Sequence, residues 1–353
     1  MNRELLMLAK PYTLKYDVAG WFCSEKLDGQ RAFWDGGVSR NAIVRNIPWA
    51  NQGNVKRLVG VSTGLWSRYG NVICAPEWWI DSLPIGTCLD GELYLGPGMR
   101  QETMSITKRL VPDDRWQSIR FSVFDSPCYS DVFADGIINN PNFQTNMNWD
   151  DCSAFLDKRS VDMSLGSGAP FDTMMDRLRL LGKDHQLGKF VDVLDQTALP
   201  FNHITEAIHK RLDLVVSHNG EGLMLRRPYS YWAPHRSSML LKVKPHHDSE
   251  AIVVGYTGGL GKYKGMLGAL VIQTVGDVSL RLRENIVFEL SGFTDIERSV
   301  SDHKLFGQYG GKRIPDELTG IVGLVPAYPL GSVVTFRFNG LTRDGIPSEA
   351  RII

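Results

Sequence analysis

The sequence predicts an α+β protein with two domains, a larger mixed domain at residues 1–247 and a small β-barrel at 248–353. The length of 353 residues is typical of two domains. Up to residue 247, strand-like runs such as 121–124 and 222–225 alternate with segments of helical periodicity. Beyond Asp248 the pattern changes to short β-rich runs separated by glycines, which is typical of a small barrel.

The individual elements follow from the spacing of apolar residues. Residues 173–181 and 204–216 carry apolar side chains three and four positions apart, which predicts two amphipathic helices. The segment 125–176 is rich in Asn, Ser, Gly and Asp, and we expect a solvated insertion of long loops flanking a short helix or two. The runs expected to form barrel strands are 251–256, 268–272, 278–282 and 333–338.

Composition excludes several classes of protein. With 43% hydrophobic and 10% aromatic residues the chain is neither disordered nor fibrous. Its five cysteines are scattered, without the spacing of a disulfide scaffold or a zinc site. No apolar stretch approaches the length of a membrane span, and the N-terminus lacks the apolar core of a signal peptide. We therefore expect a reduced protein without a membrane partner, located in the cytoplasm of a bacterium or, if phage-encoded, of a host cell.

Charge is distributed unevenly along the chain. The 39 basic and 39 acidic residues sum to zero, which by itself argues against a polyanionic partner. The net charge is nevertheless +3 for residues 1–124, −7 for 125–176, +5 for 177–247 and −1 for 248–353. The zero is therefore an average over segments of opposite sign.

A lysine stands in a short motif that can present it to a pocket. Lys26, in the run Glu25-Lys-Leu-Asp-Gly-Gln-Arg31, lies between the apolar, aromatic runs 21–23 and 32–34. Desolvation and neighbouring cations favour the neutral amine, which is a nucleophile. On its own, such a Lys-x-Asp-Gly tetrapeptide is usually only a hairpin turn.

Carboxylates and further lysines occur in similar settings. Glu92, in Asp-Gly-Glu, and Glu221, in Glu-Gly, each stand beside a glycine turn and an apolar strand. Separated carboxylates of this kind suit Mg²⁺ and ribose hydroxyls. Lys242 and Lys244 alternate on one predicted strand, so both project from the same face and can neutralise phosphates.

Taken in order, these motifs resemble those of the covalent nucleotidyltransferases, and the finer pattern resembles the minimal two-domain ATP-dependent DNA ligases of phages and bacteria. The likeness covers nearly the whole chain and thins between about 126 and 170. The motifs that carry it are Lys26-x-Asp-Gly-x-Arg31, Ser67-Arg-Tyr-Gly-Asn71, Asp90-Gly-Glu92, Phe124-Asp125, Glu221-Gly222, Lys242-x-Lys244 and Gly261-Lys-Tyr-Lys-Gly-Met-Leu-Gly-Ala-Leu270.

The resemblance implies a nucleotidyltransferase domain followed by an OB-fold domain, and an enzyme that seals nicks in three steps. ATP adenylates Lys26, the AMP passes to the 5′-phosphate of a nick in duplex DNA, and the 3′-hydroxyl displaces it. The implied cofactors are ATP, as AMP donor, and Mg²⁺ or Mn²⁺. We expect a monomer whose partner is nicked duplex DNA.

The resemblance also implies a role for each site residue. Phe124 stacks on adenine and Glu25 lies near its edge; Glu92 holds the ribose or a metal, and Glu221 a metal; Lys242 and Lys244 contact the α-phosphate; Arg31 lies near the sugar and the nick phosphate; Arg68 binds the 5′-phosphate; and Arg236 binds nucleotide or DNA.

Several alternatives remain open at this point. Ser39-Arg40, followed by Arg45, lies closer to Lys26 in sequence and competes with Ser67-Arg68. An RNA ligase or a capping-type nucleotidyltransferase shares the Lys-x-Asp-Gly core. A third interpretation is a non-catalytic nucleic-acid-binding protein with an OB-fold.

The end of the chain departs from the family pattern. Where such ligases have a Pro-Arg-Phe-Pro-like turn and a basic strand that help to orient pyrophosphate, this chain has 345–353, with Arg343 or Arg351 as candidates. The acidic segment 125–176 is expected to face away from DNA, which leaves the two positive segments for phosphate contacts.

Overall fold

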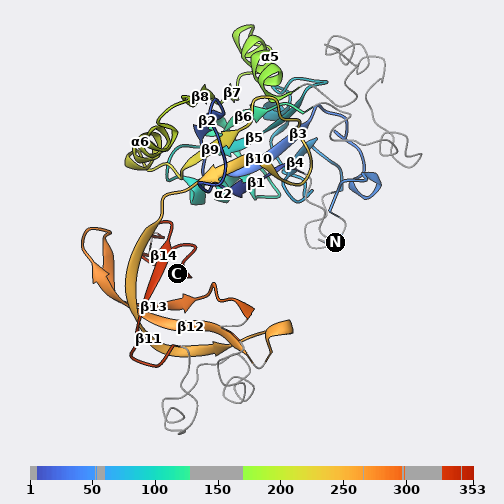
Figure 1. Cartoon of the computed structure of the whole chain (residues 1–353). Helices are drawn as coiled ribbons and strands as arrows, with labels where there is room; N and C mark the ends of the chain where they lie inside the picture. The colour runs from blue at the N-terminus through green and yellow to red at the C-terminus, as the bar shows by residue number, and fades with distance from the viewer. Residues whose placement is uncertain are drawn as a thin grey trace. The chain divides into compact units, whose positions relative to one another are not determined.

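The computed structural model describes residues 6–51, 53, 60–127, 170–264, 266–295, 298, 328–342 and 344–353. The chain divides into two compact units, residues 1–244 and 245–353, so the division falls three residues before the expected boundary at 247. Each unit is considered by itself (Figure 1). The expected insertion at 125–176 lies almost entirely outside the described residues, and so does Arg343.

Among the described residues, the larger unit holds two five-stranded sheets. The first sheet contains, in spatial order, β1 (Leu8–Pro11), β10 (Arg236–Val243), β9 (Leu223–Arg226), β2 (Phe22–Glu25) and β8 (Thr197–Ala198). The second contains β4 (Leu65–Ser67), β3 (Gln30–Asp35), β5 (Cys88–Tyr94), β6 (Arg120–Asp125) and β7 (Val191–Val193). The strands expected at 121–124 and 222–225 are confirmed as β6 and β9.

Where the structure describes this unit, four helices pack beside the sheets: α1 (Glu77–Ile80), α2 (Arg100–Thr107), α5 (Phe171–Lys183) and α6 (Ile204–Ser217). Short 3-10 turns occur at η1 (Val44–Asn46), η3 (Asp114–Ser118) and, in the smaller unit, η5 (Gly261–Tyr263). The helices expected at 173–181 and 204–216 are confirmed as α5 and α6 (Figure 1). Both are amphipathic because their apolar residues recur on one face.

Buried apolar clusters fix each sheet. Met175 and Leu178 of α5 pack on Phe121 of β6 and on Trp79, whose ring lies 5.0 Å from that of Trp116 in an edge-to-face contact. Ile208 of α6 packs on the first sheet in a separate cluster. A third cluster draws residues from both sheets, Met7, Phe33, Trp66, Trp232 and Leu240 among them, so the two sheets share one apolar layer.

The smaller unit is one curled sheet in the order β13 (Leu282–Leu290), β12 (Leu267–Asp277), β11 (His247–Gly258), β14 (Val333–Phe338) and β15 (Arg351–Ile352). Beyond β13, Ser291 bridges to Arg351 of β15, and its carbonyl accepts the N–H of Ile352 at 3.0 Å. The two edges of the sheet therefore meet, as the barrel prediction requires. Phe336 and Phe338 fill the interior.

One predicted barrel strand is wrong. Residues 278–281 form the turn between β12 and β13, and only Leu282 of the run 278–282 belongs to a strand. The Asp277 carboxylate accepts hydrogen bonds from the N–H and hydroxyl of Ser279, which closes the turn. Arg281 has a φ of 55°, and Val278 is 96% exposed. Of the alternating apolar residues that suggested a strand, Val278 is exposed in the turn, and Leu280 and Leu282 pack on the barrel core.

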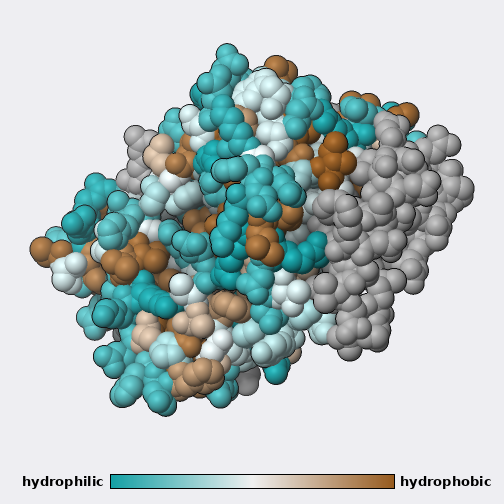
Figure 2. Space-filling model, turned by 90° about the horizontal axis from the view of Figure 1, so that it is seen from above, coloured by the Kyte–Doolittle hydropathy of each residue, from teal (hydrophilic) through white to brown (hydrophobic). Residues whose placement is uncertain are grey.

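No helix among the described residues is long and apolar enough to cross a membrane. The face seen in Figure 2 carries hydrophilic and hydrophobic residues in small, interspersed groups. Scattered apolar residues of this kind are normal at a protein surface.

A buried polar network holds the end of β3. The Asp35 carboxylate accepts hydrogen bonds from the Ser39 hydroxyl, from Trp66 Nε1 at 2.9 Å and from the N–H of Gly37 at 3.0 Å. Burial raises the pKa of Asp35 to about 6, although these donors oppose the shift. The network fixes the turn that follows β3 against β4.

Replacing Asp35 by Ala should lower the free energy of unfolding by about 3 kcal/mol, because several buried donors lose their acceptor together. Thermal and urea unfolding at pH 8 measure the change. The matched control is Asp114→Ala, at an exposed position of η3. Equal stability of the two variants would show that the network does not hold the turn.

Candidate functional site

Lys26 and Glu221 meet because β2 and β9 are paired. Glu25, the last residue of β2, stands opposite Leu223, the first of β9. The next residue, Lys26, donates its backbone N–H to the carbonyl of Gly222 at 2.8 Å. β10 lies on the other side of β9, with Val243 opposite Leu223. The neighbouring ends of three strands therefore bring the two predicted segments and the lysine strand to one edge of the first sheet (Figure 1).

Glu221 binds two lysines at this edge. One carboxylate oxygen contacts the Lys26 ammonium, and the other lies 3.0 Å from Lys244 Nζ. The three side chains are 17–24% exposed, so the cluster is open on one side. Lys242 is half-buried in β10, two residues before Lys244, which directly follows the strand.

Glycines allow this close packing. A Cβ on Gly29 would lie 2.1 Å from the carbonyl oxygen of Leu93 in β5. Gly222 has a φ of 150°, and its Cβ would lie 2.2 Å from the carbonyl oxygen of Val243. Either side chain would force backbone apart, so the glycine in each motif is a condition for the site geometry.

Glu92 reaches the same place from the second sheet. It lies in β5 opposite Arg31 of β3, and the segment 26–30 carries the chain from the first sheet to the second. Burial raises the pKa of Glu92 to about 7, Arg31 and Lys26 lower it, and Glu221 raises it further. Two carboxyl groups and a lysine are thus close enough to affect one another's charge.

Arg31 supports Phe124. Its Nε and Nη2 lie 2.6 and 2.7 Å from the two carboxylate oxygens of Asp90. The guanidinium carbon lies 4.4 Å from the centre of the half-buried Phe124 ring, in a cation–π contact. Phe124 is therefore held at the site on a charged support, rather than inside an apolar core.

Comparisons with known proteins find DNA ligases. The family model of the DNA ligase OB-like domain matches residues 258–353. A DNA ligase of Haemophilus influenzae is 24% identical over 349 residues, which cover 98% of this chain and 90% of that protein. A structure described as "DNA binding with a minimal scaffold", from a study of Lig E DNA ligases, is 27% identical with a TM-score of 0.64. The match covers 99% of this chain and 97% of that chain.

Over nearly its whole length the chain is similar to DNA ligases. A second solved structure, Pmar-Lig_PreS3, has the same fold with a TM-score of 0.61 at 18% identity, over 99% of this chain and 67% of that chain. The predicted fold class, a nucleotidyltransferase domain followed by an OB-fold domain, is therefore confirmed.

A second group of titratable residues surrounds Glu25. Burial raises the pKa of Glu25, and His218 opposes the shift. Burial, together with the charges of Glu25 and Asp28, raises the pKa of Tyr94 to about 12. Tyr94 is the last residue of β5, the strand that also carries Glu92.

The structure separates the two competing Ser-Arg pairs. Ser39 is buried in the Asp35 network, and Arg40 binds the carboxylates of Glu77 and Asp81. Arg68 directly follows β4, whose last residue, Ser67, pairs with Ala32 of β3. Arg68 therefore directly follows the strand that pairs with β3, in which Arg31 lies.

Arg236 is not brought to this group. It is the first residue of β10, and its Nη1 donates to the carbonyl of Ala9 at 2.6 Å. Lys244 follows the other end of the strand, roughly 25 Å away at the usual rise per residue. Alternation predicted which face the β10 residues share, but not how far apart they lie.

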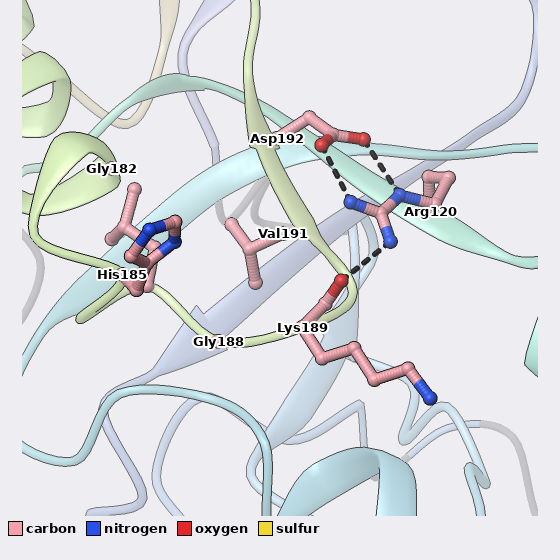
Figure 3. A pocket seen from close by; sticks show the side chains of 8 residues that line it. Arg120, Gly182, His185, Gly188, Lys189, Val191 and Asp192 are labelled. Atoms are coloured by element: carbon pink, nitrogen blue, oxygen red, sulfur yellow. Dashed lines mark hydrogen bonds and ion pairs between the residues drawn. The ribbon is translucent and has the colours of Figure 1, made fainter.

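A cavity elsewhere in the larger unit contains none of the predicted site residues. It has a volume of about 460 Å³ and is lined by Arg120, His185, Lys189 and Asp192, among others (Figure 3). Arg120 is already bound to Asp192 at 2.6 Å and to the Lys189 carbonyl. The pair of Arg120 and Asp192 holds β6 beside β7.

Sequence reasoning gave no role to the acids beneath Phe124. Asp125 lies 3.3 Å from Arg226, and burial raises the pKa of Asp125 to about 6. Asp90 binds Arg31 and also accepts a hydrogen bond from Trp232 at 3.2 Å. The only sequence signal was the presence of charged residues within strongly apolar strands.

Replacing either charged neighbour of Glu92 should shift the pKa of its carboxyl in a direction set by the charge that is removed. With a pKa of about 7, its carboxyl is mainly protonated below pH 7 and ionised above it. Glu221→Gln should lower the pKa of Glu92 because a negative neighbour is removed. Lys26→Gln should raise it because a positive neighbour is removed. Carbon-detected NMR titration of the glutamate side chains measures both shifts.

The control for this titration is Glu206→Gln, at an exposed position in the first turn of α6, which should leave Glu92 unchanged. A Glu92 that titrates near 4.5 in the unaltered protein would contradict the coupling.

Proposed function

We propose that this protein seals nicks in duplex DNA by transferring AMP from ATP through Lys26. The observation that carries the proposal is the cluster of Lys26, Glu221, Lys244 and Glu92 where two sheets meet, in a chain similar to DNA ligases. We propose that it acts as a monomer in the cytoplasm. Its relative in Haemophilus influenzae is named a DNA ligase.

The reaction has three displacements at phosphorus. The amine of Lys26 attacks the α-phosphate of ATP, so an N–P bond forms and pyrophosphate leaves. The 5′-phosphate of the nick then attacks this phosphorus, which releases the lysine and gives AMP-DNA. Finally the 3′-hydroxyl attacks the 5′-phosphate and expels AMP. Each step benefits mainly from positioning and from positive charge near the phosphates.

Lys26 has to change partner before it reacts. Only the neutral amine attacks, so Lys26 must lose a proton and leave its contact with Glu221. Lys244 binds the other oxygen of the same carboxylate and keeps Glu221 in place. Lys242 lies in β10 and Lys244 directly follows the strand, and we propose that both contact the α-phosphate.

Phe124 and Arg31 form a platform for the adenine. One face of the Phe124 ring rests on Arg31, which is fixed by two hydrogen bonds to Asp90, and a base can stack on the other. Because Nε and Nη2 of Arg31 are taken by Asp90, a contact with the sugar or the nick has to use Nη1. Glu25 continues the site beside Tyr94, in keeping with its proposed place at the adenine edge.

Mg²⁺ fits the carboxylates of this site. The charge on Glu221 raises the pKa of Glu92, so the two carboxyl groups repel each other and a cation would relieve that repulsion. The described residues contain no cluster of three or more metal-binding side chains, which suits a metal held partly by phosphates. We propose that Glu92 and Glu221 hold it, and that when bound it neutralises charge on the phosphates.

DNA contacts should come from the positively charged segments. Arg68 follows β4, which pairs with the strand that holds Arg31, and it remains our candidate for the 5′-phosphate. Arg40 binds Glu77 and Asp81. With few phosphate contacts, binding should weaken as salt rises. The proposal that the acidic insertion faces away from DNA concerns residues outside those described.

RNA-directed relatives remain the alternative. Self-labelling with ATP but not GTP, and sealing of nicked DNA but not nicked RNA, would favour a DNA ligase. A non-catalytic OB-fold protein would not become labelled at all.

Lys26→Ala should abolish self-adenylation, because the nucleophile is absent. Incubation with Mg²⁺ and α-labelled ATP, followed by denaturing electrophoresis, measures covalent label. Lys10→Ala, in β1, is the control and should keep normal labelling. Label that persists on Lys26→Ala would overturn the assignment of the nucleophile.

Arg68→Ala should self-adenylate almost normally but seal nicks at least tenfold more slowly, since a charged hydrogen bond to the 5′-phosphate is lost. Single-turnover sealing by pre-adenylated enzyme isolates the later steps. Arg40→Ala removes the same charge from the rival pair and should seal normally. Equal loss of adenylation and sealing in Arg68→Ala would place Arg68 outside the DNA site.

A further inference from the structure

Arg100 lies at the edge of the Lys26 cluster, although sequence reasoning gave it no role. It is the first residue of α2, and its Nη1 lies 2.7 Å from the carboxylate of Asp28. Asp28 belongs to the Lys-x-Asp-Gly segment, two residues after Lys26. A cation from a different element is thus attached to the loop that carries the nucleophile.

The charge of Arg100 interacts with the site beyond this contact. The hydrogen bond to Asp28 raises the pKa of Arg100, and the charges of Glu221 and Glu92 raise it further. These are the two carboxylates that flank Lys26. The guanidinium is therefore within electrostatic range of the groups that surround the reacting phosphate.

Arg100 also differs in exposure from the other cations of the site. Its side chain is 55% exposed, whereas those of Lys26 and Lys244 are 24% and 17% exposed. Both lysines are engaged with Glu221, but Nε and Nη2 of Arg100 make no hydrogen bond to the described residues. Because the side chain is largely exposed, these donors can bind an anion.

We propose that Arg100 binds the β- and γ-phosphates of ATP and so stabilises pyrophosphate as the leaving group of lysine adenylation. This inference rests on the proposed function. Phe124, Lys242 and Lys244 are half-buried and suit the adenine and the α-phosphate. The β- and γ-phosphates are then left for a more exposed cation such as Arg100. Asp28 holds Arg100 there, and the guanidinium can bind two phosphate oxygens in a fork.

The sequence gives a reason for a second source of positive charge. At 345–353 the chain lacks the Pro-Arg-Phe-Pro-like turn that the family resemblance associates with orienting pyrophosphate. Arg100 supplies a cation from the larger unit for the same leaving group. Its contribution applies to the first step and its reversal, because the later steps contain no pyrophosphate.

The test compares steps with and without pyrophosphate. In Arg100→Ala, the KM for ATP in self-adenylation should rise about tenfold or more, as should the pyrophosphate concentration that half-saturates reversal of the lysine-AMP. Sealing of a nick that is already adenylated should stay within about twofold of the unaltered enzyme. Arg100→Lys should recover part of the loss, because it keeps the charge but not the fork.

Lys108→Ala is the matched control, since it removes one positive charge from an exposed position at the other end of α2. Equal losses in all three assays would mean that Arg100 only positions the Lys26 loop through Asp28, and would overturn the proposal. Unchanged constants would do the same. If the unaltered protein takes no label from ATP, the proposed function fails first, whatever the variants do.

Discussion

The pairing of β9 between β2 and β10 is the constraint on which the rest of the site depends. Glu221 stands just before β9, and that position alone lets one carboxylate reach Lys26 on one side and Lys244 on the other. The strands can pair closely because residue 222 is a glycine: a Cβ at this position would overlap the carbonyl oxygen of Val243. Because a register slip of one residue reverses the side-chain directions of a strand, the same register also decides which residues face the nucleotide.

Much of the site could be predicted from sequence because its chemistry resides in short motifs. Glu92 and Glu221 each stand next to a glycine, and Lys26 stands three residues before Gly29. The structure gives a reason for Gly29 and Gly222, because both lie where a Cβ would overlap backbone. The residue types and spacing of these motifs therefore indicated where backbone segments pack closely at the site. The helices α5 and α6 were equally predictable, since one apolar face is enough to define each.

What could not be predicted depends on long-range pairing. The sequence predicts that Arg31 binds substrate. In the structure, two of its nitrogens donate hydrogen bonds to Asp90, 59 residues away in the sequence. The distance of Arg236 from Lys244 follows from the length of β10, which alternation alone does not give. The turn at 278–281 depends on hydrogen bonds from the Asp277 side chain, and these overcame a strand-like pattern. In each case a specific partner, rather than local propensity, decided the outcome.

The pair of Arg31 and Asp90 also explains why the platform beneath Phe124 is rigid. The Asp90 side chain is 1% exposed and that of Arg31 is 20% exposed, so neither charge is well hydrated without the other. Removing one member of such a buried pair typically costs about 3–5 kcal/mol, which is why the arginine remains under the ring. The ring is thereby fixed relative to β3 and β5, the strands that also carry Glu92 and follow Lys26.

Charges at the centre of the site are coupled, and this coupling matters for the chemistry of Lys26. The ammonium of Lys26 lowers the pKa of Glu92, while burial and Glu221 raise it to about 7. When Lys26 becomes neutral, the influence that kept Glu92 ionised is lost, so Glu92 binds a proton more readily. The total charge beside the α-phosphate therefore changes less than the loss of one lysine charge would suggest. A site that must alternate between ammonium, free amine and phosphoramidate can thus keep nearly the same electrostatic environment for its phosphates, with Lys244 retaining its contact to Glu221.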